Sequence, residues 1–168
     1  MHRKILFYLK KLDKNIEKIN DDALWRQLQE GDEEAFSLLF EKYYSMLFNY
    51  GKTLLPEADT VKDCVQDVFV DVWTYRHKLN DAILVKAYLL SSVRKRIARL
   101  RERDRIFNKA KDLDSINFLF DFSIEDHLIA SESMAIKANQ LNSLMNSLPP
   151  RQKEALYLRF HQGLSVEQ

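Results

Sequence analysis

Glycine and proline are scarce in this chain, and that scarcity constrains its fold more than any other feature. Of 168 residues only three are Gly and three are Pro, whereas turns and loops usually draw on these two residues. Leu, Lys, Glu, Asp, Ala and Phe dominate instead, which favours long helices joined by few tight turns. With 46% hydrophobic and 30% charged residues, the chain can bury the core of one or two compact domains. We therefore predict an all-α fold.

Local signals indicate where the helices begin and end. Gly31 is expected to stop a short helix over residues 22–30, and Asp32 is expected to cap a longer helix that ends before Pro56. That longer helix carries an apolar stripe at helical spacing, which is typical of a core face: Phe36, Leu39, Phe40, Tyr43, Leu47 and Tyr50. Further helices are expected over residues 86–105, from 124 or 125 to 146, and from Pro150 to a stop at Gly163.

The stretch DTVKDCVQDVFVDVW, residues 59–73, is open to two interpretations. Val68, Val70 and Val72 alternate as in a strand, and β-branched residues favour sheets. At roughly 100° per residue, however, a helix gathers the apolar and the acidic side chains into separate arcs, whereas a strand scatters both sets. We therefore predict a helix. Its apolar arc holds Val61, Val65, Val68, Phe69 and Val72, and its polar arc holds Asp59, Asp63, Gln66, Asp67 and Asp71.

The four aspartates of this helix stand at four-residue intervals, so their carboxylates are neighbours that repel one another. A solvated polar face is the ordinary interpretation of such a pattern. Here, however, only Lys62 lies nearby, Trp73 lies at the edge of the acidic face, and residues 86–105 carry eight basic against two acidic residues. Charge separated in this way indicates two partners, one basic and one polyanionic. Asp59, close to Pro56, is expected to cap the helix start.

The chain lacks the common signatures of catalysis and of metal or nucleotide binding. There is no P-loop, GxGxxG, HExxH or paired Cys set. Four aspartates could hold a hard cation only with carbonyl-bearing loops that the sequence does not offer. The single cysteine, Cys64, is best explained as a small buried residue. We predict a protein that is not an enzyme and that has no cofactor, no metal and no small-molecule substrate; a metal-carboxylate helical enzyme is a distant alternative. Neither a signal peptide nor paired cysteines are found, which favours the cytoplasm.

Three blocks in serial order, GDEEAFSLLFEKYY, DTVKDCVQDVFVDVW and AYLLSSVRKRIARLRE, closely resemble region two of bacterial RNA polymerase sigma factors of the extracytoplasmic-function (ECF) group. The tail LNSLMNSLPPRQKEALYLRFHQGLSVEQ resembles the start of their region four. The match covers residues 22–103 and 139–168. The resemblance implies a sigma factor that binds core RNA polymerase and directs promoter recognition, melting of the −10 element and transcription initiation.

The resemblance also implies roles for particular residues. In this family the acidic helix docks on the clamp helices of the polymerase largest subunit, which gives that role to Asp63, Gln66, Asp67, Asp71 and Trp73. The next loop and the basic helix hold the non-template strand, a task that requires phosphate-neutralising charge and a pocket or stacking surface for a base. The implied DNA contacts are Asn80, Asp81, Lys86, Tyr88, Arg94, Lys95, Arg96, Arg99, Arg101 and Arg103. Lys95 stands where the family usually has Asn.

The expected organisation is a basic leader over residues 1–21, a region-two domain over 22–104, an acidic linker over 105–125 and a partial region-four domain over 126–168. Ser165 and Gln168 form a capping-box pattern for a helix that the chain does not complete. The pattern predicts either a fragment of a longer sigma factor or an incomplete region four, and in both cases the helix-turn-helix that reads the −35 element is missing from the sequence. The family further implies an anti-sigma partner, often anchored in the membrane. A non-catalytic helical adaptor is the alternative function.

Overall fold

The computed structural model describes residues 20–80, 84–108, 118–119 and 132–165. Within these ranges every regular element is a helix, which confirms the all-α prediction. The helices are α2 (Asp21–Glu30), α3 (Glu33–Leu54), α4 (Ala58–Thr74), α5 (Val85–Asn108), α6 (Glu132–Asn146) and α7 (Pro150–Phe160), with a 3-10 helix η1 (Arg76–Lys78) after α4. None of the helices so described is long and apolar enough to cross a lipid bilayer. Residues 1–19 of the predicted leader, Asp81, Gln168, most of the acidic linker and the helix start predicted at residue 124 or 125 lie outside the described residues.

The junction between α2 and α3 follows the sequence signals closely. Gly31 ends α2 in the left-handed conformation, with φ of 95°, which glycine adopts without strain. The carboxylate of Asp32 then accepts hydrogen bonds from the backbone N–H groups of Glu34 and Ala35, at 2.8 and 3.1 Å, and so satisfies donors that the first helical turn leaves free. The predicted stop and the predicted cap are both confirmed.

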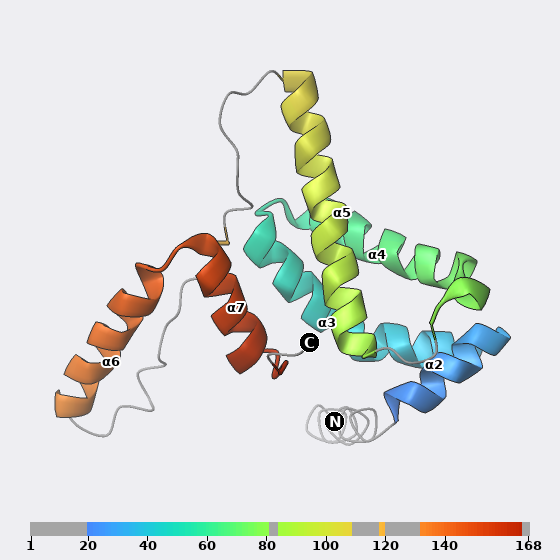
Figure 1. Ribbon diagram of the computed structural model, residues 1–168, viewed down its shortest axis with the longest axis horizontal. Coiled ribbons are helices and arrows are strands. Elements are labelled where there is room, and N and C mark those ends of the chain that lie inside the picture. The colour runs from blue at the N-terminus through green and yellow to red at the C-terminus, as the bar shows by residue number, and fades with distance from the viewer. Residues whose placement is uncertain (1–19, 81–83, 109–117, 120–131, 166–168) are drawn as a thin grey trace, which may run out of the picture.

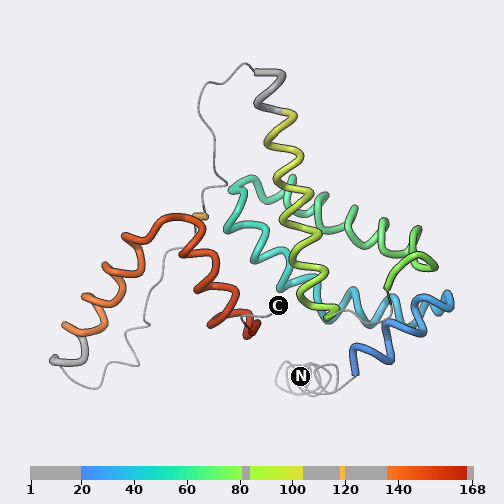
Figure 2. The backbone as a smooth tube through the Cα atoms, in the orientation of Figure 1, coloured from blue at the N-terminus to red at the C-terminus, as the bar shows by residue number. Residues whose placement is uncertain are grey.

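Helix α3 lies at the centre of the larger helical unit and contacts α2, α4 and α5, while α4 and α5 also contact each other (Figures 1 and 2). Gly51 permits close packing of α4 on α3, because a Cβ atom at this position would lie 2.5 Å from Cγ1 of Val61 on α4. Towards α5 the same Cβ atom would make only an ordinary van der Waals contact, 3.6 Å from Cδ1 of Ile97. The absence of a side chain at Gly51 therefore sets how closely α4 can pack on α3.

The core consists of the apolar faces that helical periodicity predicts. Leu39, Tyr43, Leu47 and Tyr50 of α3 are buried, and Phe36 and Phe40 are partly buried against them. The predicted apolar arc of α4 is buried in full: Val61, Val65, Val68, Phe69 and Val72. Cys64 is buried beside them, as predicted, and burial raises the pKa of its thiol.

Two predicted boundaries are wrong. Helix α4 begins at Ala58 with Glu57 at the capping position, so Asp59 does not cap it but lies in the first turn, where a negative charge faces the positive end of the helix dipole. Helix α5 continues to Asn108, three residues past the predicted end at Arg105. Nothing in the sequence there breaks a helix, because neither Gly nor Pro follows Arg105.

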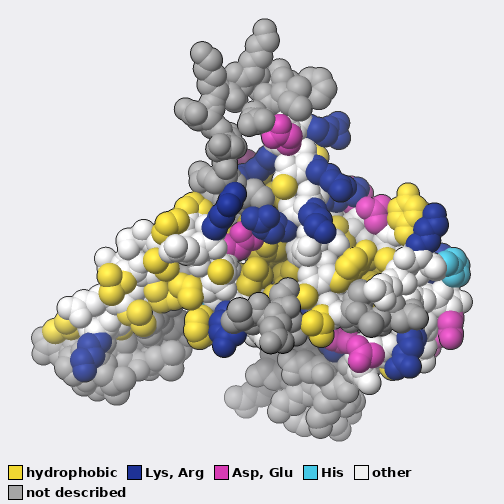
Figure 3. Space-filling view, viewed as in Figure 1, with side chains coloured by type: hydrophobic (Ala, Val, Ile, Leu, Met, Phe, Trp, Pro, Cys, Tyr) yellow, Lys and Arg dark blue, Asp and Glu magenta, His cyan; other side chains and the backbone are white. Residues whose placement is uncertain are grey.

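Helices α6 and α7 form a V in Figure 1, with α7 beside α3 and α5 and α6 pointing away from them. Pro150 stands in the first turn of α7, as predicted. The helix ends at Phe160, before the predicted stop at Gly163, whose φ of 66° lets the N–H of Leu164 turn back to the Leu158 carbonyl at 3.1 Å. Hydrophobic side chains remain exposed over both helices (Figure 3): Ile136, Leu141, Leu144 and Phe160.

Candidate functional site

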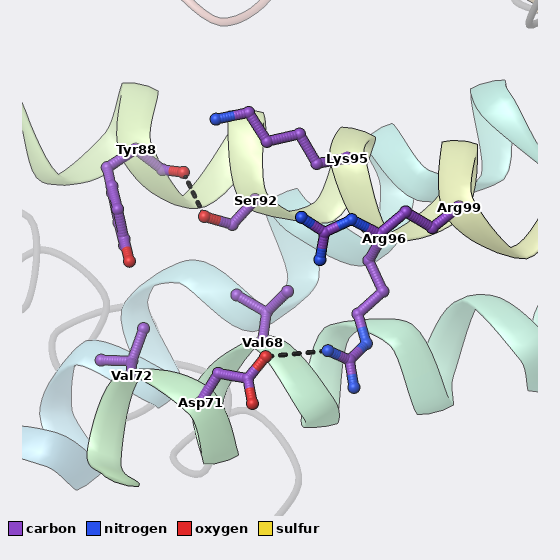
Figure 4. A pocket seen from close by; sticks show the side chains of 8 residues that line it. All are labelled: Val68, Asp71, Val72, Tyr88, Ser92, Lys95, Arg96 and Arg99. Carbon is purple, nitrogen blue, oxygen red and sulfur yellow. Dashed lines mark hydrogen bonds and ion pairs between the residues drawn. The ribbon is translucent and has the colours of Figure 1, made fainter. Parts of the chain in front are cut away.

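The acidic face of α4 is exposed, and part of its charge is balanced by a residue of α5. Arg96 reaches across from α5 and forms ion pairs with Asp67 at 2.7 Å and with Asp71 at 2.8 Å; Figure 4 shows the Asp71 contact. The hydrogen bond to Asp67 is the main reason that the pKa of Arg96 is raised. The side chains of Asp67 and Asp71 still remain 54% and 52% exposed, so both can meet a partner.

The other members of the acidic ladder are less engaged. Asp59 lies 3.7 Å from Lys62 one turn along the same helix, and its side chain is 99% exposed. Asp63 and Gln66 are exposed, and within the part of the chain that the structure describes Asp63 forms no ion pair. The repulsion along the ladder is therefore relieved unevenly, and Asp63 presents the least compensated carboxylate towards a partner.

An aromatic cluster borders the acidic face at the end of α4. The ring of Trp73 lies 5.1 Å from the ring of Phe36, and the guanidinium of Arg76 lies 4.4 Å from the centre of the Trp73 ring. Arg76 also donates a hydrogen bond to the Trp73 carbonyl at 2.7 Å. These contacts fix the orientation of Trp73, which is only partly buried. An aromatic side chain that is held in place and partly exposed is a typical interface anchor.

A shallow apolar groove between α3 and α4 adjoins this cluster. It is lined by Phe36, Phe40, Gln66, Phe69 and Val70 together with the polar Ser37 and Glu41. Val70, at 60% exposure, is a candidate contact that sequence reasoning missed, although the signal was present: it is a valine outside the apolar arc of α4. Such an exposed apolar side chain beside carboxylates adds apolar area to a polar docking surface.

Dark-blue side chains gather around α5 in Figure 3, and most of its basic residues differ in which part of the protein they contact. Arg96 faces α4, as described. Lys95 and Arg99 border a hollow between α4 and α5 that is also lined by Tyr88 and Ser92 (Figure 4). Arg94 and Lys86 face α7: Arg94 binds Glu154, and Lys86 donates to the Gln162 carbonyl. Arg103 is exposed and Arg101 is partly buried.

Helix α2 holds the start of the loop that precedes α5. The indole Nε1–H of Trp25 donates to the Asn80 carbonyl at 3.2 Å, and the Gln29 side-chain amide donates to the Leu79 carbonyl at 2.9 Å. The ring of Trp25 also meets the ring of Tyr88 edge-on, with centroids 5.6 Å apart. Sequence reasoning did not single out Trp25 or Gln29, because neither carries charge and both belong to a different helix from the one they position.

No group of three or more His, Cys, Asp or Glu side chains in the described ranges is arranged to hold a metal ion. The ladder of α4 does not converge either, because successive carboxylates lie along a helix rather than around a point. The structure thus has an acidic surface on α4 and a basic surface on α5, and the ion pairs of Arg96 connect the two.

Known proteins of one family are similar to this chain in sequence. Residues 39–106, from α3 to near the end of α5, match the family model described as Sigma-70 region 2. The ECF RNA polymerase sigma-E factor of Escherichia coli strain K12 is 28% identical, over 90% of this chain and 82% of its own length. The ECF RNA polymerase sigma factor SigK of Mycobacterium sp. strain KMS is 25% identical, over 88% of this chain and 76% of its own length. Together these similarities support an ECF sigma factor.

The similarities support a sigma-factor role in promoter recognition and transcription initiation, and ECF sigma factors bind core RNA polymerase and promoter DNA. Sigma factors are non-catalytic components of transcription, so this role is not that of an enzyme. The Sigma-70 region 2 match contains α4 and nearly all of α5, so both charged surfaces of this chain fall within the matched segment.

Proposed function

We propose that α4 is the surface by which this sigma factor docks on the clamp helices of the polymerase largest subunit. The proposed contacts are Asp63, Gln66, Asp67, Asp71 and Trp73, with Val70 added from its exposure. The observation that carries the proposal is the presence of exposed carboxylates and an anchored aromatic on one helix face, next to an apolar groove. A basic partner helix fits such a face, because it neutralises the ladder and covers the groove.

We propose further that α5 and the loop before it bind the non-template strand of the −10 element. The residues proposed for this role are Asn80, Asp81, Lys86, Tyr88, Arg94, Lys95, Arg96, Arg99, Arg101 and Arg103. The support lies in the basic side chains along one helix and in the hollow between Tyr88, Lys95 and Arg99, which offers cations beside an aromatic ring. Phosphate binding and base stacking require these two groups. Trp25 and Gln29 would position the loop rather than touch DNA.

The domain organisation and the further partners also remain proposals. We propose a region-two domain over residues 22–104 and a region-four segment over 126–168, which the V of α6 and α7 suits. The exposed apolar side chains of these two helices offer a surface for an anti-sigma factor. Because core polymerase works on chromosomal DNA, the proposed site of action is the cytoplasm.

Reversal of one charge on α4 tests the docking proposal. Asp67→Lys should weaken binding to core polymerase by roughly tenfold or more, because loss of one partner of a buried interfacial charge pair typically costs ~2–5 kcal/mol. The folded protein should lose about 1 kcal/mol or less, since the ion pair with Arg96 is solvent-exposed. Binding is measured by pull-down with core polymerase, and stability by urea denaturation.

Asp59→Lys is the matched control, because it makes the same charge change on the same helix at a side chain that is 99% exposed and outside the proposed face. The proposal requires a much smaller loss of binding for this variant. Equal losses for the two variants would indicate that only the total charge of the helix matters, and unchanged binding of Asp67→Lys would refute the docking surface.

A further inference from the structure

Helix α7 inserts a buried carboxylate between α3 and α5. Glu154 is only 6% exposed. Its two carboxylate oxygens accept hydrogen bonds from Arg94 of α5, from Nε at 2.8 Å and from a terminal guanidinium nitrogen at 3.1 Å. The hydroxyl of Tyr50, on α3, donates to the same carboxylate at 2.6 Å. One acidic side chain of α7 thus joins the two longest helices of the other unit through three charge-assisted hydrogen bonds.

Ring contacts and a further hydrogen bond accompany the ion pair at Glu154. The rings of Tyr50 and Tyr157 stack with centroids 6.0 Å apart, and Phe118 meets Tyr157 edge-on at 5.3 Å. At the end of α7, Lys86 donates to the backbone carbonyl of Gln162. Two basic residues of α5 are therefore engaged by α7 and by the turn that follows it.

The chemistry of the Arg94 contact is the same as that of phosphate binding. A guanidinium presents two parallel N–H groups to a planar carboxylate or to a phosphate with similar geometry. Arg94 cannot offer this edge to Glu154 and to a nucleic-acid phosphate at once. If a phosphate takes Arg94, Glu154 stays behind as a buried carboxylate without its counter-charge, which is strongly unfavourable. Release of α7 into solvent removes that penalty.

We propose that α7 and DNA compete for Arg94 and Lys86, so that α7 docked through Glu154 masks part of the basic surface of α5 and DNA binding displaces α7. This inference rests on the proposed role of α5 in DNA binding. In the docked state Glu154 stands in for a phosphate group. Displacement exposes α7, an 11-residue helix that has little stability without packing partners, and its backbone amides then exchange with solvent.

The test measures DNA affinity and α7 docking separately on the full chain. Affinity for a short fluorescein-labelled single-stranded DNA is taken from fluorescence anisotropy, and docking from hydrogen exchange of the amides in residues 150–160. Glu154→Gln should raise DNA affinity by several-fold and accelerate exchange in α7 without DNA. Tyr50→Phe, which keeps the stacked ring but removes one donor to Glu154, should shift both readouts in the same direction by less. In the wild-type protein, saturating DNA should accelerate exchange in α7.

Glu57→Gln is the matched control, because it removes the same charge from an exposed position before α4; it should leave exchange in α7 unchanged and alter DNA affinity less than Glu154→Gln. Equal gains in DNA affinity from the two variants would mean that the gain comes only from the change in net charge, and would overturn the inference. Protection of α7 that survives saturating DNA would overturn the competition while leaving DNA binding by α5 intact. If Arg94→Gln releases α7 yet does not weaken DNA binding, the assignment of Arg94 to DNA fails, and the competition fails with it.

Discussion

Substitution of Gly51 by alanine should destabilise this protein, although alanine is the better helix former. Gly51 lies inside α3, where the exchange alone would stabilise the helix by about 1 kcal/mol. The added methyl group, however, would stand 2.5 Å from Cγ1 of Val61, whereas carbon atoms pack best at about 3.5–4.0 Å. Val61 is fully buried and β-branched, so its side chain cannot easily rotate away.

The two effects can be weighed against each other. Overpacking of a well-filled core costs about 1–3 kcal/mol, so after the gain in helix propensity we expect Gly51→Ala to lower the free energy of unfolding by about 1 kcal/mol. In a Val61→Ala background the methyl group has room. There the same substitution should raise the free energy of unfolding by up to ~1 kcal/mol, which corresponds to a coupling of about 2 kcal/mol between the two positions.

Urea denaturation of the four proteins of this cycle, followed by far-UV circular dichroism, measures the coupling. The reasoning predicts opposite signs for Gly51→Ala in the two backgrounds. If the substitution stabilises the wild-type background, or if its effect is the same in both, then close approach of α3 and α4 is not the reason for glycine at this position.

Two further predictions concern polar contacts of buried aromatic residues. Burial raises the pKa of Tyr43 and of Tyr50 well above the ordinary 10.0, and the carboxylates of Asp21 and Glu154, respectively, reinforce this shift. Because the tyrosines of the unfolded chain ionise first, the resulting stabilisation of the fold is complete below pH 10 and falls above pH 10 by about 1.4 kcal/mol per pH unit for each tyrosine. The free energy of unfolding of Tyr43→Phe should therefore fall less steeply than that of the wild type in urea titrations above pH 10, and parallel curves would contradict the prediction. Trp25→Phe keeps a buried ring but removes the donor to the Asn80 carbonyl; it should cost about 1 kcal/mol and accelerate amide exchange in the loop before α5, whereas unchanged exchange would mean that other contacts hold the loop.

The sequence predicts the features that depend only on residues close together in the chain, such as helix ends and the buried face of a helix. Gly31 and Asp32 act as the stop and the cap because their conformations and hydrogen bonds involve only near neighbours. The buried arc of α4 followed from helical periodicity alone. The predicted capping role of Asp59 is wrong for a local reason too, since the capping position is Glu57, two residues earlier, and Asp59 lies inside the first turn.

The contacts that define the candidate surfaces were beyond sequence reasoning. The acidic ladder was expected to need a basic partner, but the pairing of Asp67 with Arg96 depends on the register at which α4 crosses α5. Glu154 and Tyr50 are 104 residues apart, and only the packing of α7 on α3 brings them together. Helix periodicity predicts which face is buried, not which residue of another helix it meets.

The positions of the two tryptophans provide the protein with a pair of optical reporters. Trp25 is almost fully buried and is bonded to the loop before α5, whereas Trp73 is partly exposed beside the acidic face with a guanidinium over its ring. The chain contains no other tryptophan. Emission from Trp73 alone, in the Trp25→Phe protein, would follow events at α4, and the difference from wild-type emission would follow the loop. Docking of a tryptophan-free partner on α4 and binding of DNA beside the loop could thus be followed separately without an added label.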